Sequence, residues 1–234
     1  MTIISNSHRF IFVHLEKCGG SSVESAYQPH AAWNDIVLGS TPEGEALQHI
    51  YEKLHGLKKH SDAARIRSVV GGVWDAYWTV AIVRHPMRIY ESYYKWIHKI
   101  VTNYARTQNV PMSAMLDHIA GLGTKRQFMR FGLTGPFLRS QDFNDFVLRY
   151  LKRVEPRTMR ARLSGADGAL LVDEWYRLEE MDRFWAALGA RTGLDLVPEH
   201  SNRGSALDLP LWSAETERAV RQRHAEDFET FGYS

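Results

Sequence analysis

The segment that most constrains the fold is a short apolar run followed at once by a glycine pair and two serines. The run covers residues 10–15 (Phe-Ile-Phe-Val-His-Leu), and its aromatic and β-branched residues are typical of a buried central strand. Residues 17–22 (Lys-Cys-Gly-Gly-Ser-Ser) come next and lead into an expected helix. A strand, a glycine turn and a helix N-terminus in this order predict one unit of an open α/β sheet.

The glycine turn also has the chemistry of an anion-binding loop. Gly19 and Gly20 have no Cβ atom, so the backbone can approach a phosphate closely, and the following helix offers unpaired N–H groups. Ser21 and Ser22 add hydroxyl donors, and Lys17 adds a cation. A bare glycine pair is more often a packing turn, but this ordered combination favours an anion site. The lysine precedes the glycines, whereas in a Walker A loop it follows them.

A second buried strand is predicted at residues 79–83 (Thr-Val-Ala-Ile-Val), and it ends at Arg84-His85-Pro86. Pro86 fits the first turn of a following helix. A planar guanidinium such as that of Arg84 suits bidentate phosphate binding. A nucleoside triphosphatase instead ends such a strand with an acidic residue that helps to hold Mg²⁺. The strand end therefore disfavours a kinase or triphosphatase.

The remaining patterns predict alternating helices and strands. Ser61 is expected to cap a helix that Gly71 ends, and Pro156 and Gly193 are expected to follow two later helices. The polar residues 1–8 are expected to lead into the first strand. Further helices are expected at 45–54, 86–100, 143–151, 181–188 and 213–228, and further strands at 170–172 and 175–178. The alternation predicts a single three-layer α/β domain over residues 1–234, with a mostly parallel central sheet flanked by helices.

Composition limits the partners and the compartment. The 234 residues carry a formal net charge of only +2, which argues against a nucleic-acid partner. Cys18 is the single cysteine, so an internal disulfide is excluded. No apolar run approaches the roughly 20 residues of a membrane span, and the N-terminal residues do not resemble a signal peptide. We expect a cytoplasmic protein without a membrane span.

At this point the sequence resembles a family. Residues 12–22 look like the 5′-phosphosulfate loop of sulfotransferases that use 3′-phosphoadenosine-5′-phosphosulfate (PAPS). The resemblance is closest to the carbohydrate (heparan-type) branch and its bacterial relatives, whose usual pattern is Pro-Lys-Thr-Gly-Gly-Thr-Ser. Glu16 replaces the proline and Cys18 replaces the threonine. Cys18 has an alternative interpretation as a nucleophile activated by the helix N-terminus.

A second segment, residues 80–94, resembles the part of the family that holds the 3′-phosphate of the nucleotide. Arg84 and Ser92 occupy the positions of the arginine and the serine that bind this phosphate. The late loop at residues 200–205 resembles one that closes over the nucleotide, which makes Arg203 a further candidate ligand. The resemblance thus implies these donor-binding residues: Lys17, Cys18, Gly19, Gly20, Ser21, Ser22, Arg84, Ser92 and Arg203.

The resemblance also implies the catalytic residues. Residues 59–67 resemble the segment that carries a base histidine, so His60 is the expected base, with His55 as the alternative. His14 lies inside a strand and is interpreted as structural. Glu16 suits the role less well, because its charge opposes that of the donor. Lys17 is expected to stabilise the charge that develops on the leaving oxygen.

The activity implied is transfer of a sulfuryl group from PAPS to a hydroxyl, with adenosine 3′,5′-bisphosphate as product and without a metal. The implied acceptor is a carbohydrate or a glycosylated small molecule, and the implied fold is P-loop-like. Residues 59–79, 172–181 and 220–233 match the family more loosely, and residues 100–140 show no match. Two alternatives stay open: a P-loop-like kinase or triphosphatase, and a non-catalytic nucleotide-binding domain. The sequence identifies neither the acceptor nor the oligomeric state.

Overall fold

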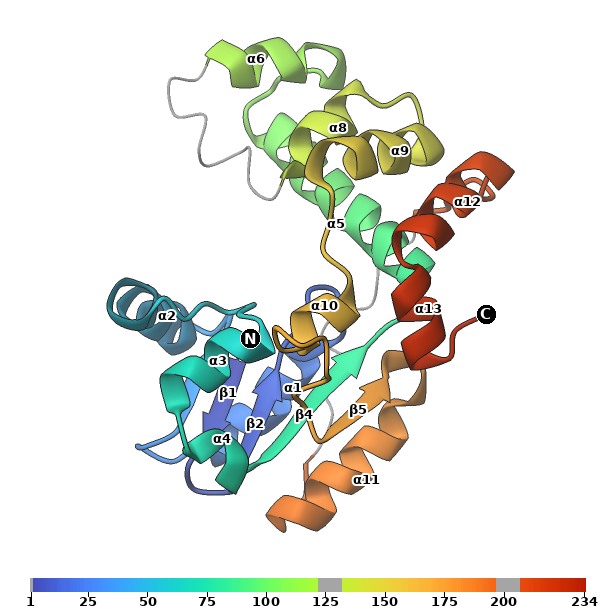
Figure 1. Ribbon diagram of the computed structural model, residues 1–234. Helices are drawn as coiled ribbons and strands as arrows, with labels where there is room; N and C mark the ends of the chain where they lie inside the picture. Colours follow the sequence, from blue (N-terminus) through green and yellow to red (C-terminus); the bar gives the residue numbers. More distant parts are fainter. Residues whose placement is uncertain (1, 122–131, 197–206) are drawn as a thin grey trace. The chain divides into compact units, whose positions relative to one another are not determined.

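A computed structural model describes residues 2–121, 132–196 and 207–234 (Figure 1). These residues cluster into two compact units. The first comprises residues 2–85, 157–196 and 229–234, and the second comprises residues 86–121, 132–156 and 207–228. The chain passes between the units more than once, so the division does not by itself define two domains. The expectation of one domain stays a prediction.

The first unit contains the sheet. Its strands are β1 (Thr2–Ser5), β2 (Phe10–Val13), β3 (Ile36–Leu38), β4 (Trp78–Val83) and β5 (Glu174–Arg177), in the spatial order β3-β1-β2-β4-β5. β1 is antiparallel to both of its neighbours, whereas β2, β4 and β5 are parallel. Four of these five strands therefore run in one direction. The predicted α/β class with a mostly parallel sheet is confirmed, with β1 as the reversed strand.

Two predictions about strands were wrong. Residues 2–5 form β1, which is buried along its whole length and pairs Ile3 with Phe12. Four residues between polar neighbours are too few to show a period, so the sequence concealed this strand. Residues 170–172 form no strand: Leu170 makes one isolated bridge, to Ser164, which closes a tight loop between them.

Helices cover both faces of the sheet. α1 (Gly20–Tyr27) and α11 (Met181–Thr192) pack on one face, where Tyr27 contacts Phe10 and Phe184 contacts Phe12, with ring centroids 5.1 and 5.9 Å apart. Ile3 of β1 pairs with Phe12 and therefore shares its face of the sheet. Side chains alternate along a strand, so the next residue, Ile4, points to the other face. That face is covered by α2 (Pro42–His55), α3 (Ala63–Val70) and α4 (Val73–Ala76) (Figure 1).

Helix ends agree with the sequence at most positions. α5 (Pro86–Thr107) begins at the expected proline, α9 (Phe143–Val154) ends just before Pro156, and Gly193 follows α11. The expected cap of α3 was wrong by one residue. Asp62 occupies the N-cap position, because the Ser61 hydroxyl instead accepts the Lys58 N–H at 2.8 Å.

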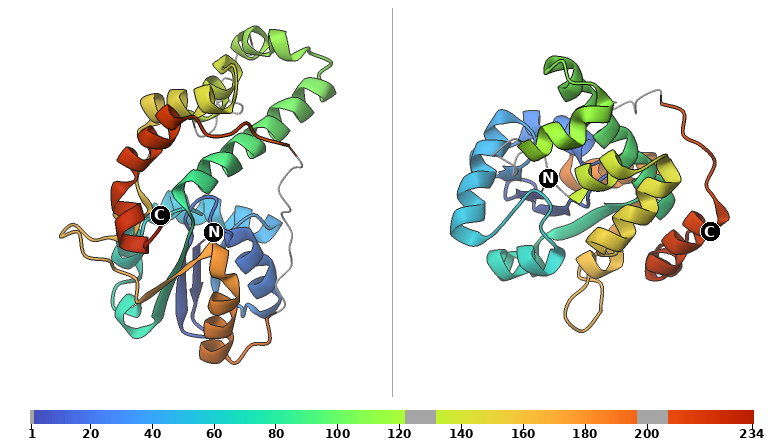
Figure 2. Two further views of the ribbon diagram at one scale, coloured as in Figure 1. Left: turned by 90° about the vertical axis from the view of Figure 1, so that its right-hand side faces the viewer. Right: turned by 90° about the horizontal axis from the view of Figure 1, so that it is seen from above.

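The second unit is helical. α8 (Thr134–Arg139), α9 and α12 (Ala214–Arg223) pack along α5, and α6 (Met115–Gly121) packs on α8 (Figure 2). The helix expected at 213–228 is in fact two, because α12 ends at His224 and α13 (Ala225–Phe231) follows. The imidazole of His224 forms hydrogen bonds at both nitrogens. Its Nε2 contacts the Tyr90 hydroxyl at 2.7 Å, and its Nδ1 contacts the Asp227 carboxylate at 2.8 Å.

The short elements complete the description. They are the helix α10 (Met159–Leu163) and the 3₁₀ turns η1 (Gln28–His30), η2 (Met112–Ala114) and η4 (Leu178–Glu180). None of the helices in the described ranges is long and apolar enough to cross a membrane.

Candidate anion-binding site

The turn between β2 and α1 is tight and carries backbone strain. The Cys18 N–H donates to the Leu15 carbonyl at 3.4 Å, and α1 begins two residues later. Lys17 and Gly19 both adopt left-handed backbone conformations, with φ of 62° and 77°. Glycine tolerates this conformation, but for lysine it is unfavourable. Residues held in such conformations cluster at functional sites, so the turn is a candidate site on geometry alone.

The start of α1 presents hydrogen-bond donors that no described residue uses. The backbone N–H groups of Gly19, Gly20 and Ser21 have no acceptor among the residues described, and no side chain caps the helix. The hydroxyls of Ser21 and Ser22 are likewise unengaged within that part of the chain. Consecutive N–H groups at the positive end of a helix form an anion-binding concavity.

Arg84 brings the second predicted motif to the same place. β4 runs parallel to β2 and pairs Ala81 with Val13, so both strands end at the same edge of the sheet. Arg84 follows β4, and its Nη1 donates to the Lys17 carbonyl oxygen at 3.0 Å. A guanidinium has five N–H donors, so this contact uses only part of its capacity. The arginine predicted at the end of β4 therefore contacts the backbone of the predicted anion-binding loop.

The loop has an excess of positive charge. Burial, and then the neighbouring Arg84 charge, lower the pKa of Lys17 to about 8. Glu16 acts in the opposite direction and partly compensates. A buried cation beside a second cation is costly unless an anion is present. The electrostatics therefore favour an anionic ligand at this edge.

His60 lies against the strand that leads into the loop. Its ring centroid is 4.4 Å from that of His14, and its Nδ1 is 3.4 Å from the His14 carbonyl oxygen. A carbonyl accepts only, so Nδ1 carries the hydrogen and Nε2 is left with a lone pair. Burial, and then the nearby charges of His14 and Lys59, lower the pKa of His60 to about 2. His60 is therefore neutral and is a weak base in the ligand-free protein.

The backbone of His60 is held by a small ionic cluster. Asp62 pairs with Arg157 and with Arg162, the latter at 2.8 Å, and Arg162 also donates to the His60 carbonyl oxygen. These contacts connect the start of α3 to α10, whose residues are far away in the sequence. They tie the backbone of His60 to α10.

Sequence reasoning missed the environment of His14. This side chain is 4% exposed, and a Cβ atom on Gly20 would lie 2.1 Å from its ring. Its Nδ1 has no hydrogen-bond partner among the described residues. Burial, followed by the charges of Lys59, Arg162 and Lys17, lowers its pKa well below the usual range. The strand alternation that places His14 beneath the start of α1 was the one available signal.

Cys18 faces the protein interior. It is 1% exposed, and its Sγ lies 3.4 Å from the Glu16 carbonyl oxygen and 4.0 Å from Met159 Sδ. The thiol is enclosed by protein atoms, which does not favour a nucleophile. Any contact with a ligand would involve the backbone of Cys18, so its role in donor binding stays a prediction.

The other predicted site residues lie elsewhere. His55 ends α2 and lines an apolar hollow on the α2–α3 face of the sheet. Ser92 lies on α5, in the second unit, whereas Arg84 belongs to the first. Arg203 lies outside the described residues. Glu179, near the end of β5, accepts the His85 N–H and the Tyr233 hydroxyl, each at 3.1 Å.

Comparisons with protein-family models, curated proteins and solved structures found no match to this chain. The fold and the site define an α/β protein with a strand–loop–helix turn suited to an anion. Any narrower function has to be argued from the residues of the site itself.

Proposed function

We propose that this chain is a PAPS-dependent sulfotransferase that acts on a hydroxyl of a carbohydrate or glycosylated small molecule. One observation carries the proposal: the Arg84 guanidinium contacts the Lys17 carbonyl at the start of α1, next to unused N–H groups. Two cations and a helix N-terminus at one sheet edge suit a ligand with more than one anionic group. The resemblance of residues 12–22 and 80–94 supplies the identity of that ligand.

Different residues would bind the two ends of the donor. Gly19, Gly20 and Ser21 would hold the 5′-phosphosulfate through backbone N–H groups, with Lys17 near the leaving oxygen. Arg84 would hold the 3′-phosphate, and Ser92 and Arg203 are further candidates for that role. When bound, the donor supplies an activated sulfuryl group. No geometry between the two units is needed for the part played by Lys17 and Arg84.

His60 would take the proton of the acceptor hydroxyl at Nε2. Its Nδ1–H is committed to the His14 carbonyl, which fixes the tautomer in which Nε2 accepts. Burial and nearby positive charge together lower the pKa of His60 to about 2. An anionic donor would offset the effect of the positive charge. Donor binding would therefore make His60 a stronger base.

The same pKa favours a second candidate, a non-catalytic nucleotide-binding domain. A base whose pKa lies far below neutrality contributes little to proton abstraction. If donor binding does not raise this pKa, the site binds the nucleotide without transferring its sulfuryl group. A kinase or triphosphatase is less favoured, because β4 is followed by Arg84 and His85 where an acidic residue would help to hold Mg²⁺.

Binding is tested by calorimetry with adenosine 3′,5′-bisphosphate and with ATP-Mg²⁺. We expect metal-independent binding of the bisphosphate, and Arg84→Ala should weaken it roughly 10- to 100-fold, as expected for a lost charged hydrogen bond. Arg67→Ala is the matched control, because Arg67 is an exposed arginine of α3 that pairs with Asp75. A preference for ATP-Mg²⁺, or equal effects of the two variants, would refute the donor assignment.

Catalysis is tested by following radiolabelled sulfate from PAPS into a panel of sugars and glycosides. His60→Ala should nearly abolish transfer while the bisphosphate affinity stays close to that of the wild type. His49→Ala, at an exposed position of α2, should leave both unchanged. Wild-type turnover in His60→Ala would remove His60 from the role of base. Bisphosphate binding without transfer to any acceptor would favour the non-catalytic candidate.

A further inference from the structure

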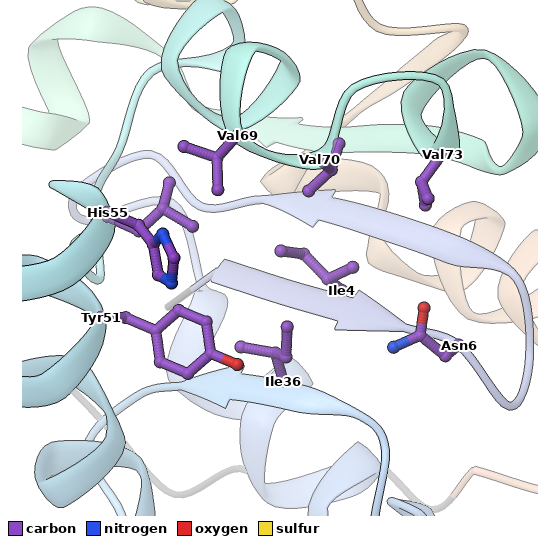
Figure 3. Close-up of a pocket in the computed structure, with 9 residues that line it drawn as sticks. Ile4, Asn6, Ile36, Tyr51, His55, Val69, Val70 and Val73 are labelled. Atoms are coloured by element: carbon purple, nitrogen blue, oxygen red, sulfur yellow. The ribbon is translucent and has the colours of Figure 1, made fainter.

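The face of the sheet opposite α1 carries a hollow of about 290 Å³ (Figure 3). Ile4 and Ile36 form its floor, and Val69, Val70 and Val73 form a wall from α3 and α4. Ligand pockets are typically concave, mostly apolar and about 300–1,000 Å³ in volume. The volume of the hollow is just below the lower limit of that range, and its lining is mostly apolar, as in a small-molecule site.

The packing of α2 explains why the hollow is open. Gly44, in the first turn, is the one residue of this helix that is buried, and a Cβ atom there would lie 2.8 Å from the Gly39 nitrogen. The start of α2 is thus held tightly against the end of β3. Ile50 and Leu54, in later turns, are 50% and 68% exposed. The side chains of Ile50 and Leu54 therefore do not fill the space above Ile4.

Two polar side chains project into the hollow from α2. Tyr51 and His55 are one turn apart, and their ring centroids are separated by 5.6 Å (Figure 3). Neither the Tyr51 hydroxyl nor the His55 imidazole has a hydrogen-bond partner among the residues the structure describes. Asn6 differs, because it donates to the Asn34 carbonyl and accepts from the Tyr77 hydroxyl at 3.1 Å. Tyr51 and His55 are therefore available to a ligand.

The lining determines the class of ligand. It contains no Lys, Arg, Asp or Glu among the described residues, so it offers no partner for a full charge. An apolar cavity of about 150 Å³ accommodates benzene, so about 290 Å³ suits a molecule of roughly ten carbon atoms. We propose that this hollow binds an uncharged apolar molecule, of the size of a bicyclic aromatic, through a hydroxyl that hydrogen-bonds to Tyr51 or His55.

This site is separate from the anion-binding edge. β1 is antiparallel to β2, so Asn6, which follows β1, lies at the sheet edge opposite to the turn that contains Lys17. Ile4 lies within β1 and faces away from the side of the sheet that α1 covers. A ligand in the hollow is therefore distinct from the donor and does not depend on the proposed transfer reaction.

The test compares 2-naphthol with naphthalene by equilibrium dialysis against the full chain. Wild-type protein should bind both saturably and should prefer 2-naphthol about three- to tenfold, as expected for one hydrogen bond. In the double variant Tyr51→Phe/His55→Phe, the affinity for 2-naphthol should fall to that for naphthalene. The affinity for naphthalene should stay within twofold, because the aromatic surface is retained.

A second pair of variants locates the ligand. Val70→Phe narrows the hollow and should weaken both ligands at least tenfold. Ile50→Phe makes a comparable change at an exposed position of α2 outside the lining and should weaken neither. Circular dichroism melts of each variant confirm folding. Absence of saturable binding to wild type, equal effects of Val70→Phe and Ile50→Phe, or a retained preference for 2-naphthol in the double variant would each overturn the proposal.

Discussion

Lys17 is held in two unfavourable conditions at once. Its backbone φ is 62°, and its pKa is lowered to about 8 by burial and by the charge of Arg84. A chain that keeps a strained, partly desolvated cation at a helix N-terminus gives up stability that an anionic ligand would restore.

The titration of Lys17 predicts how anion binding depends on pH. The free protein loses the Lys17 charge as pH rises through about 8, whereas a bound anion raises this pKa. The affinity for adenosine 3′,5′-bisphosphate should therefore be flat from pH 7 to 7.5. It should then fall by up to about tenfold per pH unit above 8. Calorimetry between pH 7 and 9.5 measures this, a range in which the phosphates of the ligand keep their charge.

Lys17→Arg is the matched control for this profile. Arginine stays protonated throughout the range, and it accepts the same backbone conformation at the same cost as lysine. Its affinity should be independent of pH between 7 and 9.5. A wild-type profile as flat as that of Lys17→Arg would show that Lys17 does not contribute its charge to the bound anion.

The residues of the site were predictable where their signal is local. Lys17 and Gly19 come directly after one predicted strand and Arg84 after another, so each was identified from its own segment and from the family resemblance. His14 and Arg162 were not predictable as parts of this edge. Arg162 reaches the His60 carbonyl from a helix about 100 positions later, and His14 acquires its role through its contact with Gly20. No local pattern encodes such contacts.

At the scale of elements, α1 is positioned by how closely its first residue approaches β2. Gly20 begins the helix directly over the His14 ring, where a Cβ atom would lie 2.1 Å from the nearest ring atom. This glycine is required for its missing side chain rather than for its backbone freedom. The N–H groups of the turn depend on the same contact for their direction.

Gly20→Ala should therefore destabilise the protein by roughly 1–3 kcal/mol through overpacking against His14, measured by urea unfolding. Gly72→Ala is the control, because the space around Gly72 is open and its φ of −61° suits alanine. The double variant Gly20→Ala/His14→Ala should lose less free energy of unfolding than the two single variants lose in sum. Strict additivity would contradict the contact between the helix start and the ring.

Elements with long local patterns were predicted, and short or non-local ones were not. β2, β4 and α5 have apolar runs or helical spacing that identify them without a partner. β1 and β3 have four and three residues, and they are strands because their neighbours in the sheet pair with them. Leu170 shows the converse, since an apolar sequence without an available strand partner stays a loop with one bridge.

At the scale of the whole molecule, charge is distributed unevenly despite a net charge of only +2. Lys17, Lys59 and Arg162 lower the pKa of one or both of the buried histidines at one sheet edge. Arg84 lowers the pKa of Lys17, and Glu16 is an acidic group that raises it. Protonation of either histidine would add positive charge to this edge. The response of the fold to acid should therefore depend on His14 and His60.

Burial and neighbouring charges lower the folded-state pKa of both histidines below 6.5, and that of His60 to about 2. Between these values the unfolded chain binds protons that the folded protein does not, so the free energy of unfolding should fall as pH drops below 6.5. Each histidine contributes at most about 1.4 kcal/mol per pH unit. Urea unfolding at pH values from 7 to 4 measures how steeply the free energy of unfolding depends on pH. His60→Gln should reduce this dependence by the equivalent of up to one bound proton. His49→Gln, at an exposed position of α2, should show the same dependence as the wild type. An unchanged slope in His60→Gln would mean that His60 reaches solvent and binds its proton in the folded protein.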